Sequence, residues 1–303
     1  GSLADLVQDW LARFGVEGTE VLRWAAVLSP CVEIDALVRL TGLETNAVAA
    51  VLDGAEQHGM LQATEGGLRF THELIARAVY NDISPLRRRV MHRRTAELLE
   101  EAAGNDLSRA ASLAHHATQS EDPGLAARAL VSAGRLCLRF FANDDALALS
   151  RKGLQLAAPL PEAERICREI ELHDILLAAG PLEDRETAAQ QYAALAERAL
   201  DLGELAHARL GYHMASTVRW EQGRWGAARE QTLQAERVAR SGDEESRIVG
   251  IAENAKCLVM IVRDLGVADA LLMEASALAK RGGFRPPAIA AGRGMLRFHA
   301  NSD

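Results

Sequence analysis

The sequence predicts a mostly α-helical protein in two parts: a small N-terminal module of three helices with a β-hairpin, then a longer series of helical hairpins. Alanine occupies 55 of the 303 positions, whereas aromatic residues make up only 4% of the chain. Alanine favours helices, and β-sandwiches and barrels rely on aromatic and β-branched residues. Apolar residues also recur at helical spacing, and short breaks rich in glycine, proline and aspartate separate the helical stretches.

The composition restricts the classes of partner. The formal net charge is −8, so the chain lacks the general basic field that holds nucleic acid, and we expect no direct nucleic-acid binding. No apolar run reaches the roughly 18 residues that a membrane span needs, so we expect no membrane partner. The four cysteines, Cys31, Cys137, Cys167 and Cys257, form no Cys-x-x-Cys pair. We therefore expect their thiols to be buried and the protein to lie in a reducing, cytoplasmic compartment. Because the chain begins with Gly1-Ser2 instead of methionine, we interpret it as a fragment of a longer protein.

The first 83 residues predict a compact module. Thr19 is a candidate N-cap for the first helix, and Ser29-Pro30 ends that helix. The predicted helices span residues 19–28, 34–40 and 44–57, and the hairpin strands span 59–63 and 67–71. Three helices followed by a hairpin are typical of a winged helix, which we assign to residues 1–83.

The third helix of this module decides whether it reads DNA. A recognition helix needs cations for the phosphates and usually Arg, Asn or Gln for the base edges. Residues 44–57 contain no lysine or arginine and three acidic residues. The sequence therefore predicts a packing module rather than a DNA-binding one.

Repeated hairpins are predicted for residues 84–303. Small residues that open the second helix of each hairpin recur at Ala146, Ala188, Ala228 and Ala270, with spacings of 42, 40 and 42 residues. Small residues at such positions allow paired helices to approach closely, as in tetratricopeptide (TPR) repeats. The best copy runs from Tyr212 to Ala228, and we expect Trp225 to fill its turn. We predict a TPR-like superhelix of α-helical hairpins, with an irregular helical bundle as the alternative.

The C-terminal residues 285–299 predict the first helix of a truncated hairpin. Without its partner helix, such a segment leaves Ile289, Met295, Leu296 and Phe298 in need of cover. A homodimer formed through this end is therefore predicted.

In a TPR array the first helix of each hairpin lines the concave face, and that face supplies the candidate binding residues. Arginines at its start and an aromatic and histidine patch further on would suit an acidic or aromatic effector, or a partner peptide. The candidates are Arg128, Arg135, Arg139, His173, His213, Thr217 and Trp220. The alternative for Trp220 is a place in the hairpin core.

A motif joins the two parts. It reads F-x-H-x-L-x-x-x-A-x-Y over residues 70–80, then a run of arginines, then H-x-x-x-A-x-x-L over residues 92–99. This stretch resembles the join between ATPase and helical repeats in large ATP-binding LuxR-type transcription regulators, bacterial ATPases of the STAND class. The resemblance covers about residues 19–99, and it extends further only by architecture.

The resemblance implies an ATPase core upstream, a winged helix, helical repeats, and a helix-turn-helix DNA-binding domain downstream. It makes His72 a candidate nucleotide sensor, because related STAND ATPases offer a winged-helix histidine to the bound ADP phosphate. The alternative is that His72 caps or packs the helix that starts at Glu73.

The arginine run starts a helix at Ser84-Pro85, a good N-terminal signal. Its cations spread around more than half of the helix, which predicts a solvated face paired with Glu97, Glu100 and Glu101. Contact with the ATPase core is the alternative. The run comprises Arg87, Arg88, Arg89, Arg93 and Arg94.

No catalytic, metal or cofactor motif is present in the sequence. None of the three lysines follows a glycine, which excludes a Walker A loop, and no zinc-ligand spacing occurs. His115 and His116 are adjacent on a predicted helix, so we expect them to diverge by about 100° and not to share one ion. We therefore expect no catalytic residue, no metal and no cofactor.

Together these observations predict a non-catalytic sensor region of a LuxR-type regulator, which binds an effector or partner protein. A TPR-like scaffold unconnected to an ATPase is the alternative. A helical enzyme whose groups converge from distant positions is a third hypothesis, which predicts a deep pocket with clustered ionisable groups.

Overall fold

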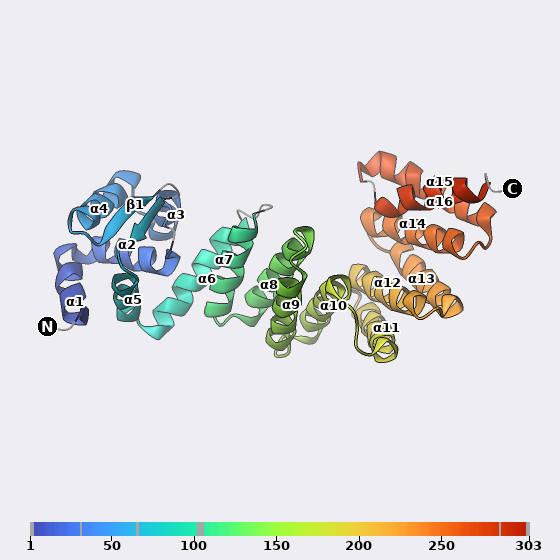
Figure 1. The fold of residues 1–303 in the computed structure, drawn as a ribbon, viewed down its shortest axis with the longest axis horizontal. Coiled ribbons are helices and arrows are strands. Elements are labelled where there is room, and N and C mark those ends of the chain that lie inside the picture. Colours follow the sequence, from blue (N-terminus) through green and yellow to red (C-terminus); the bar gives the residue numbers. More distant parts are fainter. Residues whose placement is uncertain (1–2, 31, 65–66, 102–105, 285, 301–303) are drawn as a thin grey trace. The chain divides into compact units, whose positions relative to one another are not determined.

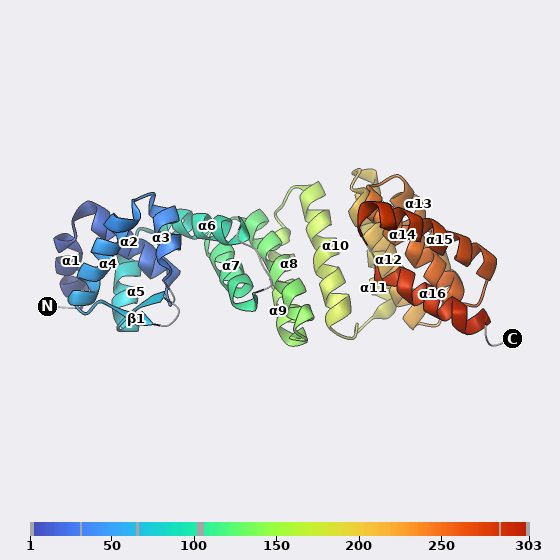
Figure 2. The ribbon, with the colours of Figure 1, turned by 90° about the horizontal axis from the view of Figure 1, so that it is seen from above.

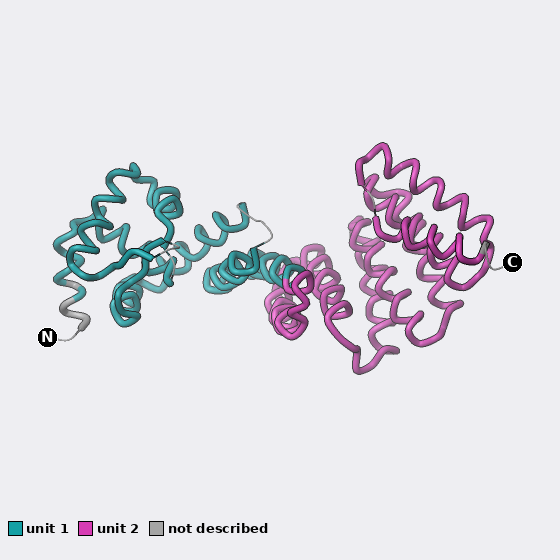
Figure 3. Tube along the Cα trace, turned by 45° about the horizontal axis from the view of Figure 1, so that its top comes forward, with its two compact units in different colours: residues 1–136 teal, residues 137–303 magenta. Residues whose placement is uncertain are grey.

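A computed structural model describes residues 3–30, 32–64, 67–101, 106–284 and 286–300. Gly1, Ser2 and Cys31 lie outside these ranges. The chain divides into two compact units, residues 1–136 and residues 137–303 (Figure 3). The predicted boundary at residues 83/84 falls inside the first unit, between two of its helices. No described helix has both the length and the apolar character that crossing a membrane requires.

The described residues of the first unit form helices and one β-hairpin (Figure 1). Its strands pair antiparallel, with Leu61 opposite Phe70 and Thr64 opposite Gly67. Val32 adds a bridge to Leu68. The elements are α1 (Leu3–Arg13), α2 (Gly15–Leu28), α3 (Ile34–Thr41), α4 (Thr45–Gln57), β1 (Leu61–Thr64), β2 (Gly67–Phe70), α5 (Glu73–Asp82), α6 (Pro85–Glu101), α7 (Leu107–Gln119) and α8 (Pro123–Arg139).

The core of the first unit forms because each helix turns one apolar stripe inward. On α4, Val48, Leu52 and Ala55 are buried, as the spacing predicts. They join Leu22 of α2 and Leu37 of α3 in one cluster. The predicted helices and the hairpin coincide closely with α2, α3, α4, β1 and β2, whereas the sequence reasoning missed α1 and the Val32 bridge.

The arginine run at the start of α6 is paired mostly with other elements of the first unit. Arg93 does contact Glu97 on its own helix, at 3.0 Å. Arg87 pairs with Glu20 of α2, and Arg89 with Glu121 before α8. The predicted pairing with Glu100 and Glu101 is wrong in this structure, because those carboxylates contact Arg128 and Arg39, respectively.

The second unit continues with antiparallel helix pairs (Figures 1 and 2). The first helices of the pairs are α10 (Glu162–Ala179), α12 (Leu205–Glu221), α14 (Glu244–Met260) and α16 (Pro287–Ala300), and the second helices are α9 (Asn143–Ala157), α11 (Arg185–Asp201), α13 (Trp225–Arg240) and α15 (Leu265–Gly282). α8 precedes α9 in the sequence, and its last residues belong to this unit.

A buried alanine stands at the fourth position of every second helix. Ala146, Ala188 and Ala228 occupy it as predicted. The fourth member is Ala268, which is 0% exposed, and not the predicted Ala270, which is exposed. The anchors are thus 42, 40 and 40 residues apart. The prediction chose the wrong alanine because Ala268 and Ala270 are both small, and only the start of α15 fixes which one faces inward.

Close helix crossings explain why small residues recur. A Cβ at Gly250 of α14 would lie 2.4 Å from Cβ of Ala239 on α13. A Cβ at Gly211 of α12 would lie 2.9 Å from Cβ of Ala196 on α11. Neighbouring helices therefore approach backbone to backbone at these crossings, and any larger side chain would separate them.

The C-terminal helix α16 is largely covered, contrary to the prediction. Ile289 packs against the cluster that α14 and α15 form. Met295 and Leu296 pack against Leu258 and its neighbours. Only Phe298 of the predicted apolar set is strongly exposed, at 69%. α14 and α15 cover much of this helix, so the predicted motive for dimerisation is much weaker.

Candidate functional site

A pocket of about 150 Å³ lies among three consecutive helices of the second unit. We call it the α12–α14 pocket. It brings together three of the predicted residues, His213, Thr217 and Trp220, all on α12. Its other lining residues are Ser216 of α12, Thr232 of α13, and Glu253, Lys256, Cys257 and Met260 of α14.

The two helices that line most of this pocket contribute equivalent positions of the repeat. Glu253, Cys257 and Met260 follow His213, Thr217 and Trp220, respectively, by 40 residues. The sequence reasoning missed the α14 residues, although adding one period to the α12 candidates would have found them. The pocket is therefore a feature of the stacked repeats and not of one hairpin.

Hydrogen bonds within the protein hold the hydroxyl groups on the pocket wall. The Ser216 hydroxyl lies 2.9 Å from the carbonyl oxygen of Ala228 and 2.7 Å from the Thr232 hydroxyl. Thr217 donates to the carbonyl oxygen of His213 at 3.0 Å. Because these hydroxyl donors are already engaged, the polar part of the wall is held in place, and the His213 ring can hydrogen-bond an occupant while Trp220, Cys257 and Met260 offer apolar contact.

Charges around His213 come from three helices. On α14, Lys256 Nζ lies 2.6 Å from Glu253 Oε2, which neutralises that pair locally. Burial lowers the pKa of His213; Lys256 and Arg209 lower it further, while Glu253 and Asp174 oppose the shift. His213 is therefore a neutral imidazole near pH 7, able both to donate and to accept one hydrogen bond.

Two tryptophans stack at the edge of the pocket. The rings of Trp220 and Trp225 are 6.1 Å apart between centroids, with an interplanar angle of 29°. The prediction that Trp225 fills the turn is wrong, because Trp225 is 58% exposed at the first position of α13. Its ring instead supports Trp220, which is half-buried and not part of the hairpin core.

His173 occupies the same repeat position as His213, 40 residues earlier, but it does not line the pocket. It contacts the second helix of its own hairpin: Nε2 lies 3.2 Å from Gln191 Nε2, and its ring lies 5.4 Å from that of Tyr192. Burial lowers the pKa of His173. This histidine therefore serves the α10–α11 contact.

The three predicted arginines lie on α8, which carries residues of both units. Arg128 approaches Glu100 of α6 at 3.5 Å, so part of its charge is used within the first unit. Arg135 and Arg139 are exposed. None of the three lines the α12–α14 pocket.

His72 is the N-cap residue of α5, and its side chain is exposed. Its carbonyl oxygen accepts from Ile75 at 3.0 Å, whereas its imidazole makes no capping hydrogen bond. The imidazole therefore does not cap α5, and its ring at this position is accessible.

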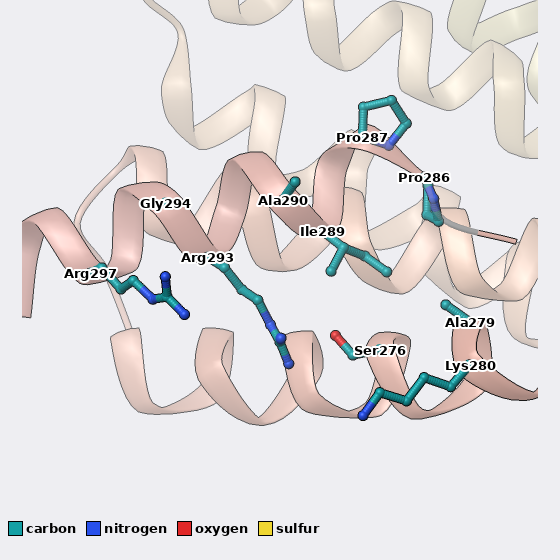
Figure 4. Close-up of a pocket in the computed structure, with 10 residues that line it drawn as sticks. All are labelled: Ser276, Ala279, Lys280, Pro286, Pro287, Ile289, Ala290, Arg293, Gly294 and Arg297. Carbon is teal, nitrogen blue, oxygen red and sulfur yellow. The ribbon is translucent and has the colours of Figure 1, made fainter.

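A larger cavity, of about 560 Å³, lies between α15 and α16 and contains none of the predicted residues. Figure 4 shows Arg293 reaching from α16 toward α15, with Lys280 and Ser276 on the opposite helix. Its cations would attract an anionic group. We take the α12–α14 pocket as the candidate site because it brings together three of the predicted binding residues, whereas this cavity contains none of them.

Two groups of side chains in the described residues could hold a metal ion. One is Cys167, Glu204 and His207, and the other is His92, His115 and His116. The expectation that His115 and His116 point apart is wrong, because both rings lie within 6 Å of His92, at 5.9 and 5.0 Å between centroids. A 100° step separates two Cα–Cβ directions, but imidazoles are long enough to lean toward a common neighbour.

No model of a protein family matches this sequence, and no curated protein matches it. Among solved structures, the chain is similar to a signal transduction ATPase with numerous domains (STAND) protein with a tetratricopeptide repeat sensor, from Pyrococcus horikoshii. The TM-score is 0.53 at 13% sequence identity, and the alignment covers 99% of this chain. At that identity the similarity establishes the fold alone, a helical fold of the TPR-sensor kind.

The alignment covers 51% of the Pyrococcus protein. The chain thus spans about half the length of that structure.

Proposed function

We propose that this chain is the non-catalytic sensor and regulatory region of a STAND-class signal-transduction ATPase of the LuxR type. In this proposal residues 1–83 are the winged helix, and the helical hairpins bind a partner. An ATPase core precedes the chain in its parent protein, and a DNA-binding domain follows it. The fold similarity to a STAND protein with a TPR sensor supports the class, and the motif at residues 70–99 supports the LuxR type.

The observation that carries the sensor role is the α12–α14 pocket on consecutive first helices. Its volume of about 150 Å³ is small for a whole effector, because small-molecule sites usually enclose about 300–1,000 Å³. It is large enough for one side chain. Trp220, Cys257 and Met260 offer apolar surface, while His213 offers one donor and one acceptor. We therefore propose a protein partner that inserts one apolar side chain here.

The parent gene tests the regulator part of the proposal. A G-x-x-x-x-G-K-[S/T] loop encoded upstream, together with a basic helix-turn-helix encoded downstream, is the expected result. If neither motif flanks the chain, the regulator assignment fails. The chain would then be a TPR-like scaffold, and His72 would lose its role as nucleotide sensor.

A peptide-display selection on the purified chain tests the pocket. We expect enriched peptides that share one apolar anchor residue, and Trp220→Ala should weaken their binding by about tenfold or more. Phe298→Ala is the matched control, because it removes an exposed aromatic ring away from the pocket and should leave binding unchanged. Equal affinity of the wild type and Trp220→Ala would exclude the pocket as the anchor site.

A further inference from the structure

Three histidines meet between α6 and α7 of the first unit, a region separate from the α12–α14 pocket. His92 lies on α6, and His115 and His116 lie on α7. Each can offer one ring nitrogen such that the three nitrogens all lie within 4.8 Å of one another. α6 and α7 pack side by side (Figures 1 and 2), so the cluster joins two helices of one unit.

We propose that His92, His115 and His116 form a binding site for a divalent transition-metal ion of the zinc class. Imidazole nitrogen is a preferred ligand of Zn²⁺, Ni²⁺, Co²⁺ and Cu²⁺, whereas Ca²⁺ and Mg²⁺ prefer oxygen. Three histidines also form a known type of zinc ligand set that leaves a fourth coordination position for water or another ligand.

The observed spacing requires only small movements to bind such an ion. Metal–nitrogen bonds of about 2.1 Å in a tetrahedral site place the ligand nitrogens about 3.4 Å apart. The Nδ1 atoms of His92 and His116 are 2.8 Å apart. They would have to separate by about half an ångström, while His115 moves inward. His115 is exposed, so its ring can turn without repacking the core.

The proton balance of binding is simple. At 2.8 Å, one proton lies between the two Nδ1 atoms of His92 and His116. When a metal ion takes the place of this proton, the proton moves to Nε2 of the ring that donated it. Both rings would then coordinate the ion through Nδ1 as neutral imidazoles, each with its single proton on Nε2, and no net proton would be released. Burial already keeps both rings neutral at pH 7, because it lowers the pKa of His92 to about 4 and that of His116 to about 3.

A second side chain is positioned to orient His92. The Tyr80 hydroxyl oxygen lies 2.9 Å from His92 Nε2, so it can accept a hydrogen bond from the Nε2–H once Nδ1 coordinates a metal. Metal-bound histidines usually donate their other N–H to such a partner. The Arg88 guanidinium, 4.9 Å from the centroid of the Tyr80 ring, packs over that ring.

A cavity gives the cluster an outlet. His115 and His116 line a cavity of about 550 Å³ in the first unit, which Glu33, Asp106 and Arg109 also line. An ion held by the three nitrogens could therefore exchange with solvent, and its fourth position would face a space that admits water or a small anion. A purely structural pair of buried histidines would need neither the third histidine nor this opening.

The group of Cys167, Glu204 and His207 is the internal competitor. Burial and the Glu204 carboxylate raise the pKa of the Cys167 thiol to about 12, so a proton must be removed at high cost before this sulfur can bind a metal. We therefore expect the histidine cluster to bind first.

Calorimetric titration of the metal-free chain, prepared without an affinity tag, with Zn²⁺ tests the site. We expect one ion per chain with a dissociation constant of about 1 μM or tighter. Co²⁺ should give the visible absorption of a tetrahedral complex. His115→Gln should lose binding yet fold normally, because His115 is exposed. His58→Gln is the matched control, because it changes an exposed histidine outside the cluster and should bind like the wild type.

Two further variants separate metal binding from folding. Tyr80→Phe should weaken Zn²⁺ binding by about 10- to 100-fold without changing the helical circular dichroism. Cys167→Ser should bind Zn²⁺ like the wild type. The proposal is overturned if the wild type binds no Zn²⁺, if His115→Gln binds it with unchanged affinity, or if Cys167→Ser is the variant that loses it.

Discussion

At the scale of the residue, the chemistry of this protein depends on what surrounds each side chain more than on its spacing in the sequence. His173 and His213 occupy the same position one repeat apart, but Gln191 and Tyr192 engage the first while a pocket receives the second. Periodicity could place both on first helices. It could not say which faces an opening, because that depends on the next hairpin.

Glu186 of α11 illustrates how one carboxylate links two helices. It accepts hydrogen bonds from Arg219, the less exposed of its partners, and Gln190, and it lies 2.9 Å from Arg224. The Arg219 hydrogen bond is the main cause that lowers the pKa of Glu186 to about 2. A lowered folded-state pKa means that the stabilisation is present above the unfolded value of 4.5 and is lost as the pH falls toward 2.

We predict that, between pH 4.5 and 2, the free energy of unfolding falls less steeply with decreasing pH in Glu186→Gln than in the wild type. The unfolded carboxylate takes up a proton in this range before the folded one does, and the variant lacks that difference. Urea unfolding at several pH values measures it. Glu230→Gln, an exposed glutamate of α13, is the control for losing one carboxylate. Parallel curves for the wild type and Glu186→Gln would contradict the prediction.

A second residue-scale prediction concerns the thiols. Cys137, Cys167 and Cys257 are buried, and burial raises the pKa of each. Since the thiolate is the reactive form, we expect alkylation by iodoacetamide at pH 8 to be slow in the folded protein and fast in urea. Mass spectrometry of digested samples measures each site. Rapid labelling of Cys167 in the folded chain would show that its thiol is more accessible than this structure has it.

At the scale of the element, the starts of helices and their apolar stripes were predictable from the sequence. The residues with which the charged side chains of a helix form ion pairs were not. The Ser84-Pro85 signal gave the start of α6, where the Ser84 hydroxyl accepts from Arg87 N at 3.4 Å. The pairing of the arginines with Glu20 and Glu121 was not predictable, because it depends on how distant helices pack. The choice of Ala270 instead of Ala268 has a different origin, because it depends on the residue at which α15 starts.

Helix crossings give a sharp test of the packing. Gly250→Ala places a Cβ 2.4 Å from Cβ of Ala239, so α13 and α14 must separate. We expect a loss of about 1–3 kcal/mol in the free energy of unfolding. Gly226→Ala is the matched control on α13, where a Cβ meets nothing within 4 Å; it should cost nothing and could add up to about 1 kcal/mol through helix propensity. Chemical denaturation compares the two, and equal stabilities would refute the close crossing.

At the scale of the whole molecule, the sequence predicted helical hairpins with a period near 40, and the second unit has them. The prediction placed its boundary at residue 83, whereas the compact units divide at residue 136. Sequence patterns mark where a hairpin ends and helices begin, but they do not reveal which helices share a core. The metal-ligand geometry of His92 with His115 and His116 escaped the sequence for the same reason, since it joins two helices.

A local loss of stability should affect mainly the neighbouring hairpins. In repeat proteins each repeat contacts only the adjacent repeats, so the effect of a destabilising substitution decreases with distance along the array. Hydrogen exchange of Gly250→Ala should therefore accelerate in α13, α14 and α15, less in α11, and not in the core of the first unit. Uniform acceleration over the whole chain would instead show that both units unfold as one cooperative body.

The α12–α14 pocket has a mechanical consequence. Its walls belong to two successive hairpins, so a partner's side chain bound in it would act as a spacer between them. Such an occupant would fix the angle between the two hairpins and stiffen the contact between them, with most of its contacts on the first helices α12 and α14. A small change of angle at that contact would become a larger displacement at the end of the second unit. A partner could thus be read out as a change of curvature, a signal that needs no rearrangement inside any single hairpin.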